Sequence, residues 1–155
     1  MVKMVADLAR RGGGRQWLIK PHGDYGRREL LGCLPGPWPE SMRIVDGALS
    51  RWFEEAGVVV SAESWTAVEA GACGLPVILF RRSQSLDFDP FGWMEDVSIP
   101  KCSDSVGLER AFDDLKAGHA GARERRDAFA ERILSACVAP PAANPWQAIL
   151  ADDRQ

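Results

Sequence analysis

The sequence has few of the side chains that usually bind metals or transfer protons at neutral pH. Its 155 residues include two histidines, His22 and His119, and four cysteines with no Cys-x-x-Cys pair. The four cysteines are separated by 40, 29 and 35 residues: Cys33, Cys73, Cys102 and Cys137. This spacing argues against a zinc site and predicts reduced, mostly buried thiols. We therefore expect neither a metal nor a cofactor.

The chain also has little net charge and no long apolar run. Its formal charge is −3, and its composition, 46% hydrophobic and 26% charged, is that of a globular protein. Nothing in this balance suggests a nucleic-acid partner. No apolar run approaches the roughly 20 residues that cross a bilayer. Asp7 and Arg10 lie where a signal peptide needs its apolar core. These absences predict a cytoplasmic protein with no transmembrane segment.

Short apolar runs alternate with segments of helical periodicity. The predicted strands are residues 16–21, 42–45, 58–60, 76–80 and, more weakly, 96–99. The predicted helices are residues 2–10, which Gly12–Gly14 end, then 27–31, 48–56, 65–73 and a charged segment, 107–137, broken near Gly118–Gly121. This alternation predicts an α/β fold with a mostly parallel sheet and helices on both faces. Residues 1–137 would form this domain, and residues 138–155 a crossing segment with a short helix.

The segment VVVSAESWTAVEAGACGLPVILF, residues 58–80, contains the most informative polar residues. Ser64 is in position to cap a helix that Gly74 ends, with Pro76 just beyond. The first turn of a helix offers free N–H groups and a positive dipole end, which bind phosphate. The hydroxyls of Ser61, Ser64 and Thr66 add donors at the same place.

Glu69 is the one acid in the middle of this helix. Helical geometry places it one turn above the N-terminus, between Trp65 and Cys73 on an apolar face. A carboxylate on a covered face needs a partner, and the two hydroxyls of a ribose would satisfy both of its oxygens. The alternative is a pairing with an arginine of the core or with a nearby loop.

The stretch SAESWTAVEAGACGLPVILF resembles the donor-binding signature of the GT-B glycosyltransferases, a strand and Ser/Thr turn followed by E-A-x-A-x-G-x-P-V-I. WLIKPHG and ALSRWFEEAGVVVSAES are similar to further elements of the same domain in families that make bacterial capsular and surface polysaccharides. The resemblance covers roughly residues 1–137. It implies a Rossmann-like domain that binds a nucleotide-sugar donor and forms the C-terminal half of a two-domain enzyme.

Position by position, the resemblance makes Glu69 the ribose ligand and Ser64 with Thr66 the ligands of the donor phosphates. His22 would reach the phosphates or the sugar from the neighbouring strand, although Gly23 replaces the proline of the family pattern. Trp65 replaces a small residue and would narrow the phosphate site or stack on the base. No catalytic base is assigned, because inverting members take it from the other half.

The resemblance also implies parts that this sequence does not contain. The acceptor domain and the first strand of the nucleotide-binding half have no counterpart here, so we expect a fragment or one half of a split enzyme, inactive alone. The strands around Leu18 and Val59 would then either pair directly or leave a gap that favours self-association or a donated strand. Two alternatives are a UDP-sugar 2-epimerase-like half-domain and a non-catalytic partner subunit. The motif Asp87-Phe88-Asp89 resembles a metal-binding D-x-D, but it follows a strand of a different fold.

Overall fold

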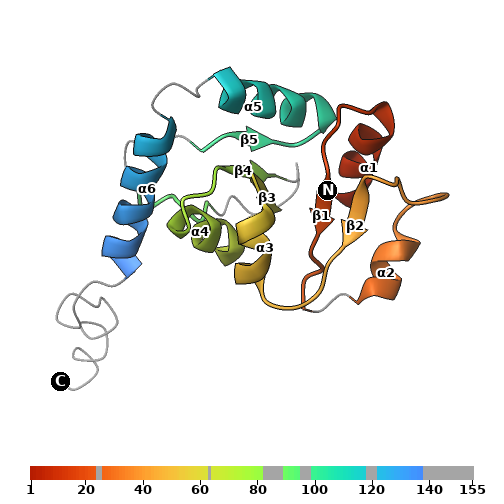
Figure 1. The fold of residues 1–155 in the computed structure, drawn as a ribbon, viewed down its shortest axis with the longest axis horizontal. Helices are drawn as coiled ribbons and strands as arrows, with labels where there is room; N and C mark the ends of the chain where they lie inside the picture. The colour runs from red at the N-terminus through yellow and green to blue at the C-terminus, as the bar shows by residue number, and fades with distance from the viewer. Residues whose placement is uncertain (24–25, 63, 82–88, 95–98, 118–121, 138–155) are drawn as a thin grey trace, which may run out of the picture.

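The structure is a computed structural model that describes residues 1–23, 26–62, 64–81, 89–94, 99–117 and 122–137. Helices and strands alternate from residue 2 to residue 80, and a further strand and then two helices follow (Figure 1). The strands are β1 (Trp17–Ile19), β2 (Met42–Ile44), β3 (Val59–Ala62), β4 (Val77–Phe80) and β5 (Lys101–Cys102). The helices are α1 (Val2–Arg11), α2 (Arg27–Gly32), α3 (Leu49–Glu55), α4 (Trp65–Ala72), α5 (Ser105–Ala117) and α6 (Ala122–Cys137).

Most of the predicted elements are confirmed within a residue or two. The three glycines after α1 all have positive φ, 87°, 109° and 68°, a conformation that side chains with a Cβ rarely adopt, and they end the helix as predicted. Three predicted features lie wholly or mostly outside the described residues: the break Gly118–Gly121, the segment 138–155 and all of the strand Asp96–Ile99 except Ile99. β5 was not predicted, since two residues are too few to show a period.

Every strand pair is parallel, which confirms an α/β fold with parallel strands. However, the described strands form two sheets: β1 pairs with β2, and β4 lies between β3 and β5. Leu18 is opposite Arg43 in the first sheet, and Val60 is opposite Ile78 in the second. The predicted alternatives for the middle of the sheet were direct pairing of β1 with β3 and a gap between them, and the described strands leave the gap.

Helices cover both faces of the β3–β4–β5 sheet. Val77 and Leu79 of β4 pack with α4 and with Ile133 of α6. Ile78 and Phe80, which alternate with them, pack on the opposite side with α1 and α5. All four residues of β4 are therefore buried, as its unbroken apolar run predicts.

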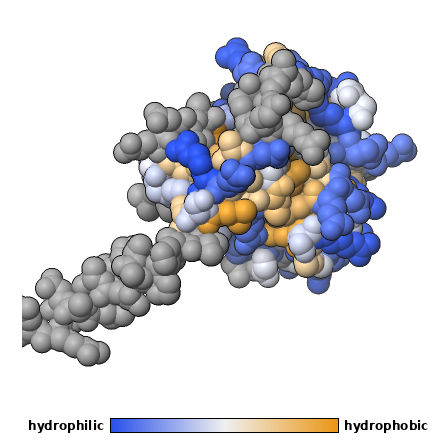
Figure 2. Space-filling view, turned by 60° about the vertical axis from the view of Figure 1, so that its left-hand side comes forward, coloured by the Kyte–Doolittle hydropathy of each residue, from blue (hydrophilic) through white to orange (hydrophobic). Residues whose placement is uncertain are grey.

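β3 differs from β4, although its VVV run predicted a strand buried on both faces. Val58, Val59 and Val60 are only partly buried. One edge of β3 pairs with β4, and the other edge pairs with no strand that the structure describes. Figure 2 shows one face of the molecule on which hydrophobic surface gathers between hydrophilic margins, so the core is not fully covered there.

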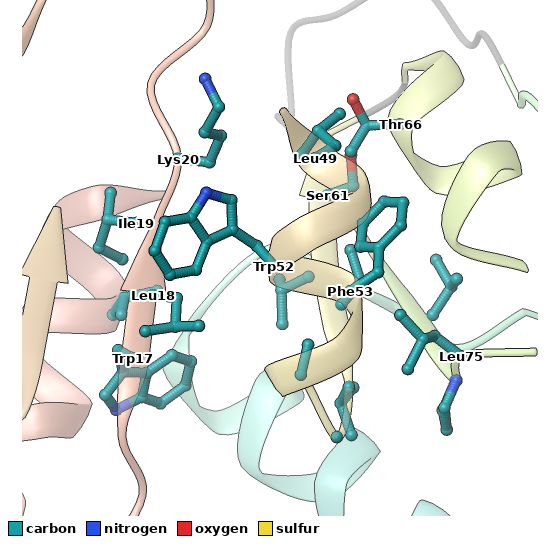
Figure 3. Close-up of a pocket in the computed structure, with 18 of the residues that line it drawn as sticks. Trp17, Leu18, Ile19, Lys20, Leu49, Trp52, Phe53, Ser61, Thr66 and Leu75 are labelled. Carbon is teal, nitrogen blue, oxygen red and sulfur yellow. The ribbon is translucent and has the colours of Figure 1, made fainter. Parts of the chain in front are cut away.

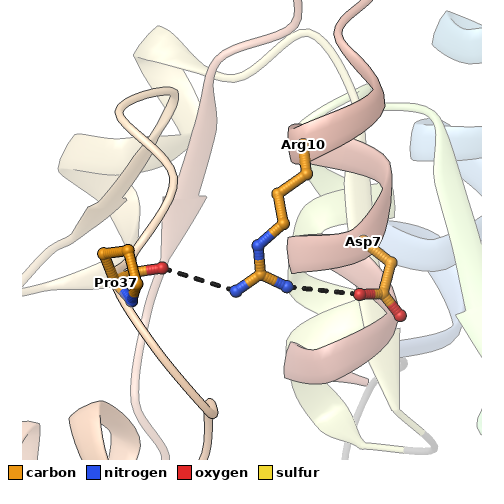
Figure 4. A network of polar contacts seen from close by, with 3 residues as sticks. All are labelled: Asp7, Arg10 and Pro37. Carbon is orange, nitrogen blue, oxygen red and sulfur yellow. Dashed lines mark hydrogen bonds and ion pairs between the residues drawn. The ribbon is translucent and has the colours of Figure 1, made fainter.

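Arg10 joins α1 to the loop that follows α2 (Figure 4). Its guanidinium contacts Asp7 Oδ1 at 3.3 Å through Nη1 and donates to the carbonyl of Pro37 at 3.4 Å through Nη2. This exposed contact fixes the loop beside the helix that packs on β1 and β2 through Val5 and Ala6.

Two further findings concern the cysteines and the membrane. Three described cysteines are free thiols: Cys33 and Cys73, which are exposed, and Cys102, which is buried. The prediction of mostly buried thiols is thus wrong for the first two, which are the C-cap residues of α2 and α4. Among the described residues, no helix is both long enough and apolar enough to cross a membrane.

Candidate functional site

The carboxyl ends of β1 and β3 open onto one cavity. It has a volume of about 1740 Å³, and its walls include all of β1, residues 58–62 around β3, and one side of α3. We call the part between β1 and β3 the mid-sheet groove. In Figure 3, Lys20, Ser61 and Thr66 lie at one end of this cavity, with Trp17 and Leu75 at the other. Polar groups therefore gather where the two strands end.

Ser64 occupies the N-cap position of α4 with extended backbone, φ −151° and ψ 161°, as predicted. Its side chain does not cap the helix, however. Its hydroxyl lies 3.0 Å from the hydroxyl of Ser61, whose Oγ donates to the carbonyl of Ala62 at 2.9 Å. Ser61 is 6% exposed, and a buried hydroxyl needs partners, so Ser64 is used to satisfy it.

This arrangement leaves the first turn of α4 without a side-chain cap. The first turn contains no acidic residue, so no carboxylate there offsets the positive end of the helix dipole. The N–H of Ala67 bonds to the carbonyl of Ser64 at 3.0 Å. The hydroxyl of Thr66, beside this turn, lines the cavity. An anion at this end would meet N–H and O–H donors together.

The structure brings together four of the six predicted site residues. His22, Ser61, Ser64 and Thr66 all line the cavity. Trp65 and Glu69 lie instead on the outer face of α4, exposed to solvent, and Trp65 is 64% exposed. Because Glu69 is exposed, its carboxylate carries no burial cost in this chain, and only its position one turn above the N-terminus still connects it with the site.

Two cavity residues were missed by the sequence interpretation. Lys20 directly follows β1, and its side chain extends toward the end of the cavity where Ser61 and Thr66 lie (Figure 3). A lysine just after a strand, two residues before His22, is the signal that could have found it. Trp52 of α3 points toward β1 (Figure 3), and its indole N–H donates to the carbonyl of Asp46 at 2.7 Å.

Asp89, the described acid of the D-x-D motif, has structural partners. Its carboxylate accepts from the N–H of Phe91 at 2.9 Å and from the Lys101 ammonium at 2.5 Å. Burial raises the pKa of Asp89, but these two hydrogen bonds and the charges of Lys101 and Arg81 outweigh it and hold the pKa below its ordinary value. Asp87 lies outside the described residues. Among the residues that the structure describes, no group of three metal-ligating side chains occurs.

Comparisons with known proteins give no relative. No protein-family model, curated protein sequence or solved structure matches the chain.

Proposed function

We propose that the chain is the nucleotide-sugar-binding domain of a glycosyltransferase that acts in surface polysaccharide synthesis. The observation that supports it best is that His22, Ser61, Ser64 and Thr66 line one cavity at the N-terminus of α4. His22 follows β1, Ser61 belongs to β3, and the other two lie at the start of α4, so the cavity gathers residues from separate elements.

The donor phosphates would lie at the N-terminus of α4. The uncapped first turn and the hydroxyl of Thr66 offer neutral donors, and the ammonium of Lys20 adds a positive charge at the same end of the cavity. In transfer, the bond from the sugar to the phosphate breaks, and negative charge grows on the departing phosphate. Dipoles already oriented toward that charge stabilise it without reorganisation.

The nucleoside would lie along the outer face of α4. Residues four apart in a helix are neighbours on its surface, so Trp65 and Glu69 form one exposed stripe that starts at the phosphate end. The indole offers a flat surface for the base, and the carboxylate accepts hydrogen bonds from the two ribose hydroxyls.

The architecture supports a Rossmann-like domain, one half of a GT-B enzyme. Its strand pairs are parallel, helices cover both faces of the larger sheet, and the cavity lies at the carboxyl ends of strands, where α/β folds bind their ligands. The acceptor and the catalytic base would come from a second domain or chain, so this chain supplies the leaving-group side and makes no transfer alone.

A thermal-shift screen with UDP, CMP, CDP and GDP tests donor binding. A nucleotide at 100 times its Kd adds about 2.7 kcal/mol to the free energy of unfolding. For a chain of this size, that is a rise in Tm of roughly 5–10 °C. We expect the rise to persist in excess chelator, since the proposed ligands are N–H, O–H and ammonium groups.

Single substitutions test whether the nucleotide-induced rise in Tm comes from binding at α4. Glu69→Ala should abolish most of the nucleotide-induced rise and leave the Tm without nucleotide unchanged, because the side chain is exposed. Glu131→Ala, which removes an exposed acid from α6, is the matched control and should keep the full rise. If Glu69→Ala responds to nucleotide as the parent does, the role of Glu69 is wrong. If none of the four nucleotides shifts the parent, the proposed function fails.

A further inference from the structure

We infer that the mid-sheet groove accepts a strand from a partner polypeptide, a short extended apolar segment that lies between β1 and β3 and pairs with both. This inference does not depend on nucleotide binding. It rests on the backbone of the two strands, on the walls of the groove and on its charge.

The backbone of β1 has one edge paired and one edge facing the groove. The N–H of Trp17 donates to the carbonyl of Ser41 at 2.8 Å, and the carbonyl of Ile19 accepts from Val45 at 3.0 Å. Successive residues of a strand direct their N–H and C=O groups to opposite edges. The backbone groups of Leu18, between them, therefore point away from β2 and toward the groove.

β3 presents the matching edge on the other side. Its Val59 N–H donates to the carbonyl of Pro76 at 2.9 Å, and Ser61 is opposite Leu79 in the ladder with β4. By the same alternation, Val60 directs its N–H and C=O toward the groove. Neither edge pairs with another strand in the described part of the chain.

The two edges run in the same direction. In Figure 3, β1 runs from Trp17 to Lys20 toward the end of the cavity where Ser61 lies. β3 begins beside Pro76, next to Leu75 at the opposite end, and runs to Ser61. A segment parallel to both would continue the all-parallel pairing of the two sheets. β1 has three residues and β3 four, so the segment would need about four or five residues.

The walls of the groove favour apolar side chains on both faces of the segment. Leu49, Trp52 and Phe53 of α3 line one side. Val5 of α1 and Phe112 of α5 line the cavity as well. The volume of about 1740 Å³ exceeds the roughly 300–1,000 Å³ of small-molecule pockets, so a nucleotide would not fill it.

The charged side chains that line the cavity indicate which residues should stand at the two ends of the partner segment. The described residues lining the cavity include six Lys or Arg and three Asp or Glu side chains. One of those acids, Glu55, is already paired with Arg43 at 3.1 Å. Lys20 follows the carboxyl end of β1, and Arg15 precedes its amino end. We therefore assign the partner a β-branched apolar centre with an acidic residue at each end.

Amide hydrogen exchange tests this, with the synthetic peptide acetyl-Glu-Val-Ile-Val-Val-Glu-amide as the probe. In dilute protein alone, the amides of Leu18 and Val60 should exchange faster than those of Trp17 and Val59, which are bonded within the sheets. The peptide should slow Leu18 and Val60 at least tenfold. The same peptide with N-methyl groups on its two central residues lacks those donors and should give no protection.

Each other outcome overturns the inference. Slow exchange at Leu18 and Val60 without peptide would mean that the groove closes by itself. Protection that grows with protein concentration would assign the groove to a second copy. If Leu18 and Val60 exchange slowly without peptide, and deletion of residues 138–155 makes them exchange fast, the end of this chain occupies the groove. A peptide that gives no protection, or an N-methylated peptide that protects equally, would show that the edges do not pair with a strand.

Discussion

At the scale of single residues, the partner of a polar side chain depends on which groups the fold brings beside it. Ser64 is the clearest case, because its position at a helix start predicted a capping hydroxyl. The structure uses that hydroxyl to satisfy the buried Ser61 instead. Sequence spacing predicted which residues gather at the N-terminus of α4. It could not predict whether the Ser64 hydroxyl would bond to a backbone N–H of the first turn or to the hydroxyl of Ser61.

Asp89 gives a prediction about pH. Its folded-state pKa lies below its ordinary value, so its ionised form stabilises the fold above roughly pH 4, and this contribution is lost as the pH falls through the folded-state pKa. We expect Asp89→Asn to lower the free energy of unfolding by about 0.5–1 kcal/mol at pH 6. The difference from the parent should shrink toward zero near pH 2.

Urea unfolding at both pH values measures this difference. Asp113→Asn, at an exposed position of α5, is the matched control and should differ little from the parent at either pH. A difference for Asp89→Asn that stays the same at pH 2 would show that the charge of the carboxylate is not what Lys101 and Phe91 stabilise.

At the scale of elements, the contact between α4 and α6 depends on one glycine. A Cβ on Gly71 would lie 2.7 Å from Ile133 Cδ1 and 2.8 Å from Phe129 Cε1. Ile133 is fully buried, so it has little room to move. Overpacking of this kind costs about 1–3 kcal/mol. The gain in helix propensity from glycine to alanine is at most about 1 kcal/mol.

We therefore expect Gly71→Ala to destabilise the chain by about 1 kcal/mol, measured by urea unfolding. Gly32→Ala is the matched control, because no atom lies within 4 Å of a Cβ built there, and it should leave stability unchanged or raise it. Adding Ile133→Val to Gly71→Ala removes the methyl group that clashes and should recover part of the loss. A Gly71→Ala protein as stable as the control variant would mean that α6 does not pack closely on α4.

The elements also show where sequence patterns succeed. α4 and β4 were predicted almost to the residue, because Gly74 and Pro76 separate a helical period from a continuous apolar run. β5 was missed because two residues carry no period. The exposed face of α4 was misjudged from its composition. The apolar residues around Glu69 predicted a covered face, yet Trp65, Glu69 and Cys73 are all exposed.

At the scale of the whole molecule, the order of the strands matters most. Periodicity predicts that strands exist and that they are parallel. Which strands pair depends on backbone hydrogen bonds, and the pattern of side chains does not determine these. The sequence left two possibilities for the middle of the sheet, and only the hydrogen bonds of β1 and β3 decide between them. Lys20 was overlooked for a related reason, because its nearness to Ser61 follows from the relative placement of two sheets.

The central claim is that a nucleotide binds at the N-terminus of α4, in the cavity that β1 and β3 line. A two-dimensional amide NMR titration with the nucleotide that gives the largest thermal shift tests it most directly. We predict the largest shift changes at the amides of Thr66 and Ala67, with smaller ones at Lys20 and Ser61, and little change in α6. Changes that avoid the first turn of α4, or a spectrum that the nucleotide leaves unaltered, would contradict the account.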